Sequence, residues 1–290
     1  MSQTAFPAWG EVWQAPAKLN LFLHVIGRRA DGYHLLQSVF QLIDWCDELR
    51  FEPRTDGKIV RASVVDGVPE ASDLIIRAAH QLQATAAISQ GVSIHITKRL
   101  PIGGGLGGGS SDAATTLIAL NHLWHCGLSR AELAKIGLTL GADVPFFLFG
   151  SNAFAEGIGE ALQPIELARA WFVVLTPQCQ VPTAEIFRSG ALTRDSKSVI
   201  MLGFPRSIAG FLAEPYHNDL EAVATALYPP VQQALSWLSR FGQARMSGSG
   251  ACVFAAFATR EQAQLVAQQA AADCGVEVVR SLAQHPHQVA

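Results

Sequence analysis

The chain has 290 residues, of which 49% are hydrophobic, and its formal net charge is −3 at neutral pH. This length exceeds one typical domain and this composition supports full-sized cores, so we expect two domains around a shared cleft rather than a disordered chain. The sequence has no long basic or acidic run and no apolar run near the ~20 residues of a membrane span, which argues against nucleic acid and membrane partners and favours a small molecule.

The five cysteines lie far apart and form no C-x-x-C pair. This is typical of reduced thiols in a cytosolic protein and offers no zinc framework. Residues 1–17 lack the cationic start and the apolar core of a signal peptide. We therefore expect a cytoplasmic protein without a metal site built from its own side chains.

The first strong pattern is the alternation of residues 18–26, which predicts a strand ended by Gly27. The leucines and the valine at odd positions would share the core face, while Lys18 and Asn20 share the other face. This polar pair emerges at the start of the strand, where it could reach a ligand. An ordinary strand-end lysine in solvent would account for Lys18 as well.

After a turn, strand-like runs follow over residues 33–45 and 47–52. Tyr33 and His34 open the first run. An aromatic ring and an imidazole beside a turn could stack on and hydrogen-bond a base, or could simply flank the turn. Periodicity does not decide between these interpretations.

Helical spacing over residues 73–84 and alternation over residues 92–97 lead to a run of six glycines and two serines within residues 101–113. Glycine keeps side chains away from a ligand and allows positive φ, so consecutive N–H groups can converge on an anion. The helical segment after this loop is predicted to be capped by Ser110 or Ser111. A strand, a glycine loop and a helix N-terminus together predict the triphosphate cradle of a nucleotide-binding enzyme.

The glycine run does not meet the requirements of several familiar glycine-rich loop types. A Walker loop needs a lysine after the glycines, and a Rossmann fingerprint needs a second parallel strand with an acidic residue about 20 residues on. A protein-kinase loop needs the H-R-D and D-F-G motifs, which the chain lacks. A flexible linker is disfavoured because ordered elements flank the loop closely.

The capping box that begins at Ser129 predicts a helix up to Leu140, with Gly141 as its stop. Asp143 follows on a turn that is predicted to lead into an apolar strand. Its carboxylate could point into a cleft, or could bond the backbone of its own turn. Residues 152–160 predict a hairpin that closes the first domain.

From Trp171 onward, strands interleave with helices that lie on one side, which suggests a split β-α-β sandwich resembling the ferredoxin-like fold. The glycine-serine turn at residues 246–252 is either a tight turn or a second backbone nest that faces the first loop across the cleft. The predicted strands are 171–175, 252–257 and 276–279, and the predicted helices are 183–188, 217–227, 230–241 and 260–272.

Residues 101–113 resemble the P-x-G-x-G-L-G-x-S-S-x-A loop of the GHMP kinases (galactokinase, homoserine kinase, mevalonate kinase and relatives), with one extra glycine before Ser110. The resemblance spans nearly the whole chain in the family's order, through residues 16–21 with 31–34, 101–113, 141–145 and 246–252. It implies an α/β (α+β) two-domain fold. Residues 1–165 would form the N-terminal nucleotide-binding α/β domain, and residues 166–290 a C-terminal ferredoxin-like α/β sandwich on the substrate side.

Residues 16–21 together with 31–34 are similar to those of family members that transfer the γ-phosphoryl group of ATP to the 2-hydroxyl of a diphosphocytidyl methylerythritol. This acceptor is a small cytidine diphosphate substrate of non-mevalonate isoprenoid synthesis. The resemblance implies that Asp143 is the general base and Lys18 its cationic neighbour. His34 would read the cytosine, with Tyr33 stacking near it and Phe187 closing the other side of the base. The remaining implied substrate contacts are Asn20 and Thr183.

The resemblance also implies that the glycine loop binds ATP and that Mg²⁺ is bound mainly through phosphate oxygens, without a clear protein ligand. The implied ATP-binding residues are Pro101, Ile102, Gly103, Gly104, Gly105, Leu106, Gly107, Gly108, Gly109, Ser110 and Ser111.

Two alternatives remain open: a GHMP kinase for mevalonate, homoserine or a sugar, and a non-catalytic nucleotide-binding regulator. The set of Lys18, Asn20, Tyr33 and His34 argues against the first, and the pair of Lys18 and Asp143 against the second. The sequence leaves open whether the protein is a monomer or a homodimer, and whether the last strand and tail return to the first domain.

Overall fold

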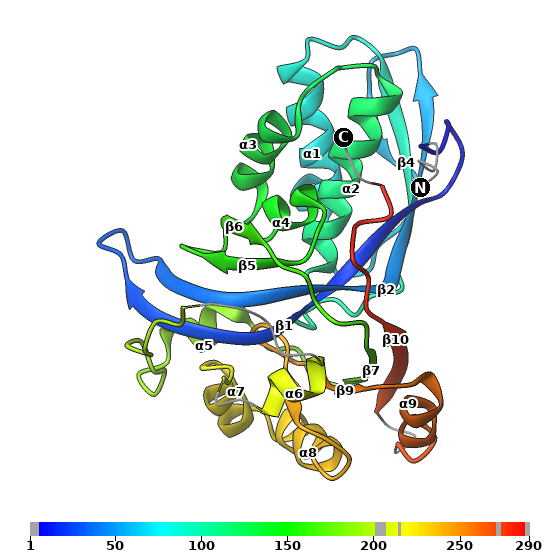
Figure 1. Cartoon of the computed structure of the whole chain (residues 1–290). Helices are drawn as coiled ribbons and strands as arrows, with labels where there is room; N and C mark the ends of the chain where they lie inside the picture. Colours follow the sequence, from blue (N-terminus) through cyan, green and yellow to red (C-terminus); the bar gives the residue numbers. More distant parts are fainter. Residues whose placement is uncertain (1–5, 201–206, 214–215, 271–273, 288–290) are drawn as a thin grey trace.

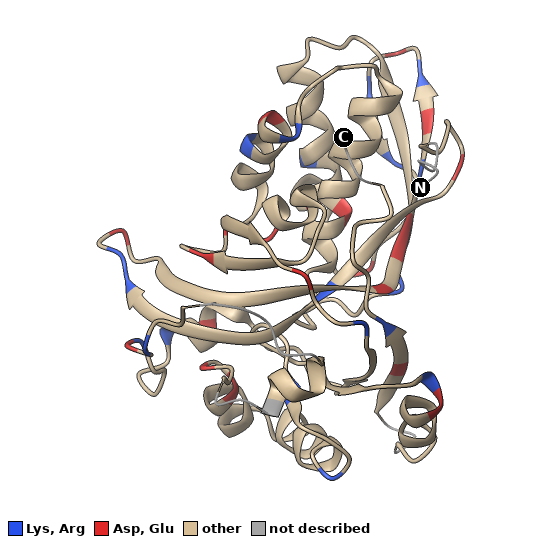
Figure 2. Ribbon diagram, in the orientation of Figure 1, with Lys and Arg blue, Asp and Glu red and all other residues tan. Residues whose placement is uncertain are grey.

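A computed structural model describes residues 6–200, 207–213, 216–270 and 274–287 of the chain. Figure 1 shows an upper part in which helices cover one side of a sheet, and a lower part built on a second sheet. In the part of the chain that the structure describes, no helix has both the length and the apolar character needed to cross a membrane. Basic and acidic residues are interspersed over both parts (Figure 2).

The upper sheet has the strand order β3-β4-β2-β5-β6, and β1 pairs with β2 alongside this path. Helices α1 to α4 pack on it, and the largest of the apolar cores lies between them. The strands are β1 (Trp13–Arg28), β2 (His34–Arg54), β3 (Ile59–Arg61), β4 (Gly91–Thr97), β5 (Ala153–Glu156) and β6 (Ala161–Pro164). The helices are a 3₁₀ turn (Glu70–Ser72), α1 (Leu74–Thr85), α2 (Gly108–Leu123), α3 (Arg130–Leu140) and α4 (Val144–Phe149).

The hairpin of β1 and β2 departs from the prediction in one respect. The two runs predicted at 33–45 and 47–52 form one continuous strand. The pairing shifts from Pro16 with Cys46 to Ala17 with Ile43, so β2 has a bulge near the predicted break. A bulge keeps a strand continuous while it bends and disturbs the alternation of side chains, which is why the sequence resembles two strands.

Two local predictions near Asp143 have opposite outcomes. The capping box at Ser129 is confirmed, with both reciprocal hydrogen bonds to Glu132 present. The apolar strand predicted after Asp143 is wrong, because Val144–Phe149 is the short helix α4. Pro145 in the first turn suits a helix start, and an apolar run this short has no periodicity that distinguishes a buried strand from a buried helix.

The lower sheet confirms the ferredoxin-like prediction. Its strand order is β10-β7-β9-β8, and every neighbouring pair is antiparallel. The strands are β7 (Trp171–Thr176), β8 (Ala244–Met246), β9 (Val253–Phe257) and β10 (Gly275–Arg280). The helices are α5 (Thr183–Arg188), α6 (Ile208–Ala213), α7 (Glu221–Leu227), α8 (Pro229–Leu238) and α9 (Arg260–Ala267).

Three helices in this half have bounds that differ from the prediction. The helix predicted over residues 230–241 spans Pro229–Leu238. The helix predicted from residue 217 begins at Glu221, because the Asn218 side chain accepts a hydrogen bond from Leu220 N and forms a turn there. Helix α9 ends at Ala267, and the last two residues predicted for it lie outside the described residues.

The two halves share a core. Leu19 and Phe22 of β1 are fully buried in one apolar cluster with Phe172 and Phe254 of the lower sheet. The segment after β10 also links the halves, because residues 281–287 run back up to α2 (Figure 1). His285 N donates to Gly150 O at 2.8 Å, and its Nε2 lies 3.4 Å from Thr115 Oγ1 on α2. The tail therefore does return to the first domain.

Candidate active site

A cleft of about 910 Å³ lies where the two halves meet. It takes residues from the β1–β2 hairpin, from the glycine loop and from α5 and its neighbours. All the site residues proposed from the sequence line it, except Ser111, which is fully buried inside α2. Those that line it are Lys18, Asn20, Tyr33, His34, Pro101, Ile102, Gly103, Gly104, Gly105, Leu106, Gly107, Gly108, Gly109, Ser110, Asp143, Thr183 and Phe187.

The glycine loop has the alternating backbone that makes anion-binding nests. Gly103, Gly105 and Gly107 have φ of +73°, +75° and +73°. Helix α2 begins at Gly108 with Gly107 as its N-cap, so the predicted serine cap is wrong. Both serines already lie within the first turn, and no side chain in this described segment caps the helix. Its first N–H groups are therefore directed toward the cleft end without a side-chain partner, as an anion site requires.

The turn at residues 246–252 packs directly against the glycine loop. Ser247 Oγ donates to Gly105 O at 2.9 Å, and Cys252 N donates to Gly104 O at 3.1 Å. A Cβ on Gly105 would lie 2.0 Å from Ser247 O, so only glycine allows this approach. The second half thus supports the loop instead of facing it across open space, although Gly248 also lines the cleft.

Lys18 contacts both the glycine loop and the carboxylate of Asp143, which also lines the cleft. Its backbone N donates to Leu106 O at 2.9 Å, and its Nζ donates to Asn20 Oδ1 at 2.5 Å. The same Nζ lies 3.6 Å from Asp143 Oδ2. The Lys18 side chain is 4% exposed and that of Asp143 is 35% exposed, so the cation is buried while the carboxylate can meet a ligand.

Asn20 is held by contacts on both of its sides. Its Nδ2 donates to Ser38 Oγ at 2.8 Å, which directs Oδ1 toward Lys18. Its backbone N donates to Ser247 Oγ at 3.2 Å, and Ser38 Oγ in turn donates to Phe22 O at 2.5 Å. Ser38 was missed by the sequence reasoning, since a serine within a strand carries no motif.

At the other end of the cleft, aromatic and polar side chains from both halves come together. The rings of His34 and Phe187 lie with their centroids 4.9 Å apart and their planes at 31°. Tyr33 is 60% exposed, and Thr183 Oγ1 lies 2.7 Å from Ser249 Oγ. Flat rings and hydroxyl groups of this kind suit a heterocyclic base.

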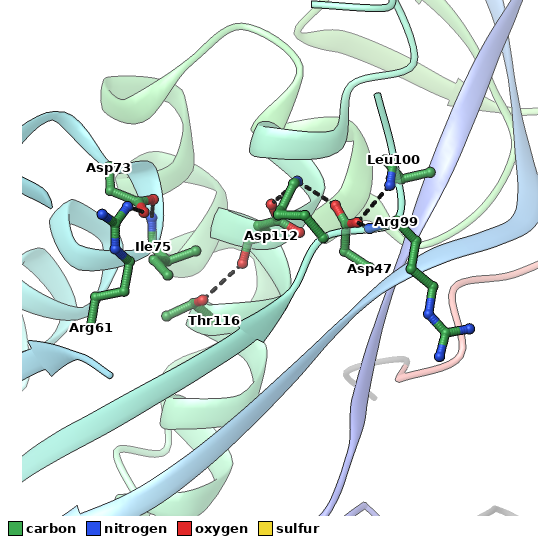
Figure 3. A network of polar contacts seen from close by, with 9 residues as sticks. Asp47, Arg61, Asp73, Ile75, Arg99, Leu100, Asp112 and Thr116 are labelled. Atoms are coloured by element: carbon green, nitrogen blue, oxygen red, sulfur yellow. Dashed lines mark hydrogen bonds and ion pairs between the residues drawn. The ribbon is translucent and has the colours of Figure 1, made fainter. Parts of the chain in front are cut away.

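A buried network braces the entry to the glycine loop (Figure 3). Lys98 Nζ donates to Asp47 and, at 2.7 Å, to Asp112 on α2. Asp47, which is fully buried, also accepts from Arg99 N at 2.5 Å and from Leu100 N at 2.8 Å. These amides directly precede the loop, so the network fixes the end of β4 relative to α2. It was also missed, because its members are far apart in sequence and match no motif.

The network contains two carboxyl groups, Asp47 and Asp112, but only one cation, the Lys98 ammonium. Asp47 also accepts two backbone N–H groups. Burial raises the pKa of Asp112 well above its usual range, and the Asp47 charge adds to this, against the opposing effect of Lys98. The pKa of Lys98 is raised by Asp112 and Asp47, despite burial. Asp112 therefore holds a proton more readily than an aspartate in water does.

The described residues contain no group of three or more His, Cys, Asp or Glu side chains arranged to hold a metal ion. Of the cleft's carboxylates near the loop, Asp143 lies beside Lys18 and Asp112 is bonded to Lys98. This donor set fits a cation that takes most of its ligands from phosphate oxygens and water, as Mg²⁺ commonly does.

The chain matches two protein-family models, that of the GHMP kinase N-terminal domain over residues 73–151 and that of the GHMP kinase C-terminal region over residues 202–275. It is 57% identical over 273 residues to the 4-diphosphocytidyl-2-C-methyl-D-erythritol kinase of Cupriavidus taiwanensis, covering 94% of this chain and 93% of that one. It is 56% identical over 276 residues to the enzyme of the same name from Dechloromonas aromatica, covering 95% and 98%. Among solved structures, it resembles a 4-(cytidine 5'-diphospho)-2C-methyl-D-erythritol kinase with a TM-score of 0.79 and 34% identity, over 93% of this chain and 99% of that one.

Proposed function

Because this chain belongs to the GHMP kinase family, we propose that it transfers the γ-phosphoryl group of ATP to the 2-hydroxyl of 4-diphosphocytidyl-2-C-methyl-D-erythritol, a step of non-mevalonate isoprenoid synthesis. The chain is a small-molecule kinase, a phosphotransferase with an alcohol acceptor. We take this acceptor from the names of the similar enzymes. Its hydroxyl group would suit the cleft end that holds Lys18 and Asp143, and its cytosine would suit the end with the aromatic rings.

The observation that carries the proposal is the position of Lys18. Its backbone is bonded to the glycine loop, and its Nζ lies 3.6 Å from a carboxylate oxygen of Asp143. Phosphoryl transfer needs positioning, charge neutralisation and an aligned nucleophile more than covalent help. A cation and a carboxylate at the end of a phosphate-binding loop supply these needs in one place.

We assign Asp143 the role of general base. An alcohol is a poor nucleophile, and a carboxylate at hydrogen-bond distance accepts its proton as the new P–O bond forms. Asp143 is partly exposed to the cleft, so an acceptor hydroxyl can reach it. The Lys18 ammonium can stabilise the negative charge that develops on the transferring group, and Asn20 holds this ammonium in place.

The glycine loop and the start of α2 would hold the β- and γ-phosphates of ATP through backbone N–H groups. Mg²⁺, when bound with ATP, would supply charge neutralisation between the phosphate oxygens. The cytosine would lie at the end formed by Tyr33, His34 and Phe187, with Thr183 near the bound acceptor. The cleft volume of about 910 Å³ is at the upper end of small-molecule sites, which suits two nucleotide-sized ligands.

The test is ADP release with ATP, Mg²⁺ and 4-diphosphocytidyl-2-C-methyl-D-erythritol, with mevalonate and homoserine as control acceptors. Turnover on the first acceptor alone supports the proposal. Turnover on a control acceptor alone would overturn the assigned acceptor. ATP binding without turnover on any acceptor would indicate a nucleotide-binding regulator.

The base is tested with Asp143→Asn, which keeps the shape of the side chain and removes its ability to take a proton. We expect kcat to fall by at least about a hundredfold, the usual contribution of a general base, while ATP binding stays largely intact. Turnover within about threefold of the unmodified protein would remove Asp143 from this role.

A further inference from the structure

The guanidinium group of Arg194 holds together the two rings that lie at the base end of the cleft. Arg194 Nε donates to His34 Nε2 at 3.1 Å. Its Nη2 donates to Phe187 O at 2.9 Å and to Ser189 O at 2.8 Å, and its Nη1 donates to Leu192 O at 3.0 Å. One side chain thus connects the end of α5 with the start of β2, which come from opposite halves of the molecule.

These contacts place Arg194 outside the cleft, against residues that form its wall. A guanidinium has five N–H groups, and four of them are already used by the four acceptors just named. Arg194 does not line the cleft, whereas His34 and Phe187 do. It is therefore unsuited to bind the diphosphate of a ligand and suited to place the groups that meet the base.

The bond to His34 also fixes where that ring carries its proton. An arginine can only donate, so Nε2 must be the acceptor and the neutral imidazole must carry its hydrogen on Nδ1. Among the described residues Nδ1 has no hydrogen-bond partner. The ring, which lines the cleft, therefore has one N–H group that can donate to a ligand.

We propose that Arg194 is a positioning residue for base recognition, which holds His34 as its Nδ1–H tautomer so that the ring donates to an acceptor atom on the edge of the pyrimidine. This inference rests on the proposed function, in which His34 contacts the cytosine. Cytosine offers two ring-edge acceptors, its carbonyl oxygen and its unprotonated ring nitrogen. A histidine with its proton on Nε2 would present a lone pair to these atoms instead.

The surroundings of His34 support this role. Burial lowers the pKa of His34, and the positive charges of Arg194 and of Arg28 on β1 lower it further. The ring therefore stays neutral around pH 7, and a neutral ring has a choice of tautomer that Arg194 can settle. Without Arg194 the neutral ring would populate both tautomers. Protonation at lower pH would then restore a hydrogen on Nδ1.

The experiment compares Arg194→Gln with the unmodified protein at pH 7.5 and pH 6.0. At pH 7.5 we expect KM for 4-diphosphocytidyl-2-C-methyl-D-erythritol to rise about three- to fivefold, because only the share of neutral rings with the hydrogen on Nδ1 can still donate, with KM for ATP and kcat changed less than twofold. At pH 6.0 the difference in KM should shrink, because the protonated ring of the variant donates again from Nδ1. Arg188→Gln, which removes an exposed charge from the last residue of α5, is the matched control and should change neither KM.

Two further measurements separate tautomer control from a purely structural role. In ¹⁵N-histidine NMR, the unmodified protein should show His34 with the hydrogen on Nδ1, and Arg194→Gln should shift it toward Nε2. In a double-mutant cycle, Arg194→Gln should add little to the KM change of His34→Ala, because Arg194 acts through that ring. Arg194→Lys keeps one donor and should recover part of the effect, and it serves if the glutamine variant does not fold.

The outcomes distinguish this inference from the proposed function. If the unmodified protein does not phosphorylate the cytidine diphosphate acceptor, the proposed function fails, and the NMR measurement still tests the tautomer. If the unmodified protein is active but Arg194→Gln leaves KM unchanged, the inference is overturned. A rise in KM that is equal at both pH values and additive with His34→Ala would overturn it as well, since Arg194 would then be acting only on the fold.

Discussion

The close packing of Gly105 against the turn of the second half gives a sharp test of how the glycine loop is held in place. We compare Gly105→Ala with Gly103→Ala, because both residues have nearly the same positive φ, +75° and +73°. A Cβ at Gly103 would have no atom within 4 Å, whereas a Cβ at Gly105 would lie 2.0 Å from Ser247 O and 3.1 Å from Gly250 O. The pair therefore separates backbone strain from steric conflict.

The magnitudes follow from these contacts. An alanine in the left-handed region costs about 1–2 kcal/mol, and this is all that Gly103→Ala should lose in free energy of unfolding. Gly105→Ala carries the same strain and must also push the two loops apart. The hydrogen bonds from Ser247 Oγ to Gly105 O and from Cys252 N to Gly104 O would then break, at about 1 kcal/mol each. We expect a total loss of about 3–4 kcal/mol, which a protein with a typical stability of about 5–15 kcal/mol survives.

The assay is urea unfolding of both variants, followed by KM for ATP. Gly105→Ala should also raise KM for ATP more than Gly103→Ala does, because displacing the loop moves the N–H groups that we propose as phosphate ligands. Equal destabilisation by the two substitutions would refute the reasoning, since it would mean that the contact with Ser247 contributes nothing. The comparison is internal, so it does not depend on the absolute stability of the protein.

Three other predictions concern separate parts of the molecule. Phe187→Ala should raise KM for the cytidine diphosphate acceptor much more than KM for ATP in steady-state kinetics, and an unchanged acceptor KM would remove Phe187 from the base pocket. Lys98→Met leaves two buried carboxyl groups without their cation, so the free energy of unfolding at pH 7 should fall by about 3–5 kcal/mol. The loss should be smaller at lower pH, because Asp112 then takes up a proton. Denaturant titrations at both pH values check this. Burial lowers the pKa of His285 from 6.5 to about 3, so between these pH values the unfolded chain binds a proton that the folded chain does not, and stability should decrease as pH falls through this window. His285→Gln should make this decrease less steep in unfolding measured as a function of pH. An unchanged slope would contradict the lowered pKa of His285.

Much of the candidate site was accessible from the sequence because its chemistry is local. The glycine run, the Lys18–Asn20 spacing and the Asp143 turn each lie within a short stretch, and all three line one cleft. The ferredoxin-like class of the second half followed from the interleaving of strands and helices in the same way, although the short strand β8 was not predicted.

The features that sequence reasoning missed depend on contacts between distant residues. Arg194 meets His34, and Asp47 meets Lys98, across many intervening residues, and no spacing rule links such pairs. The wrong predictions have a local cause instead. The run after Asp143 is too short and too uniformly apolar to show a period, and the serines after the glycines cannot cap a helix that begins before them.

The return of residues 281–287 to the first domain has a consequence for how the protein is made. Leu282 N donates to Leu42 O, and His285 lies beside Thr115 on α2, the helix that follows the glycine loop. A ribosome delivers this segment long after it has delivered the sheet and helix that the segment covers. The upper half therefore cannot complete these contacts during translation until the whole lower half has been synthesised, because residues 281–287 follow the last strand of that half.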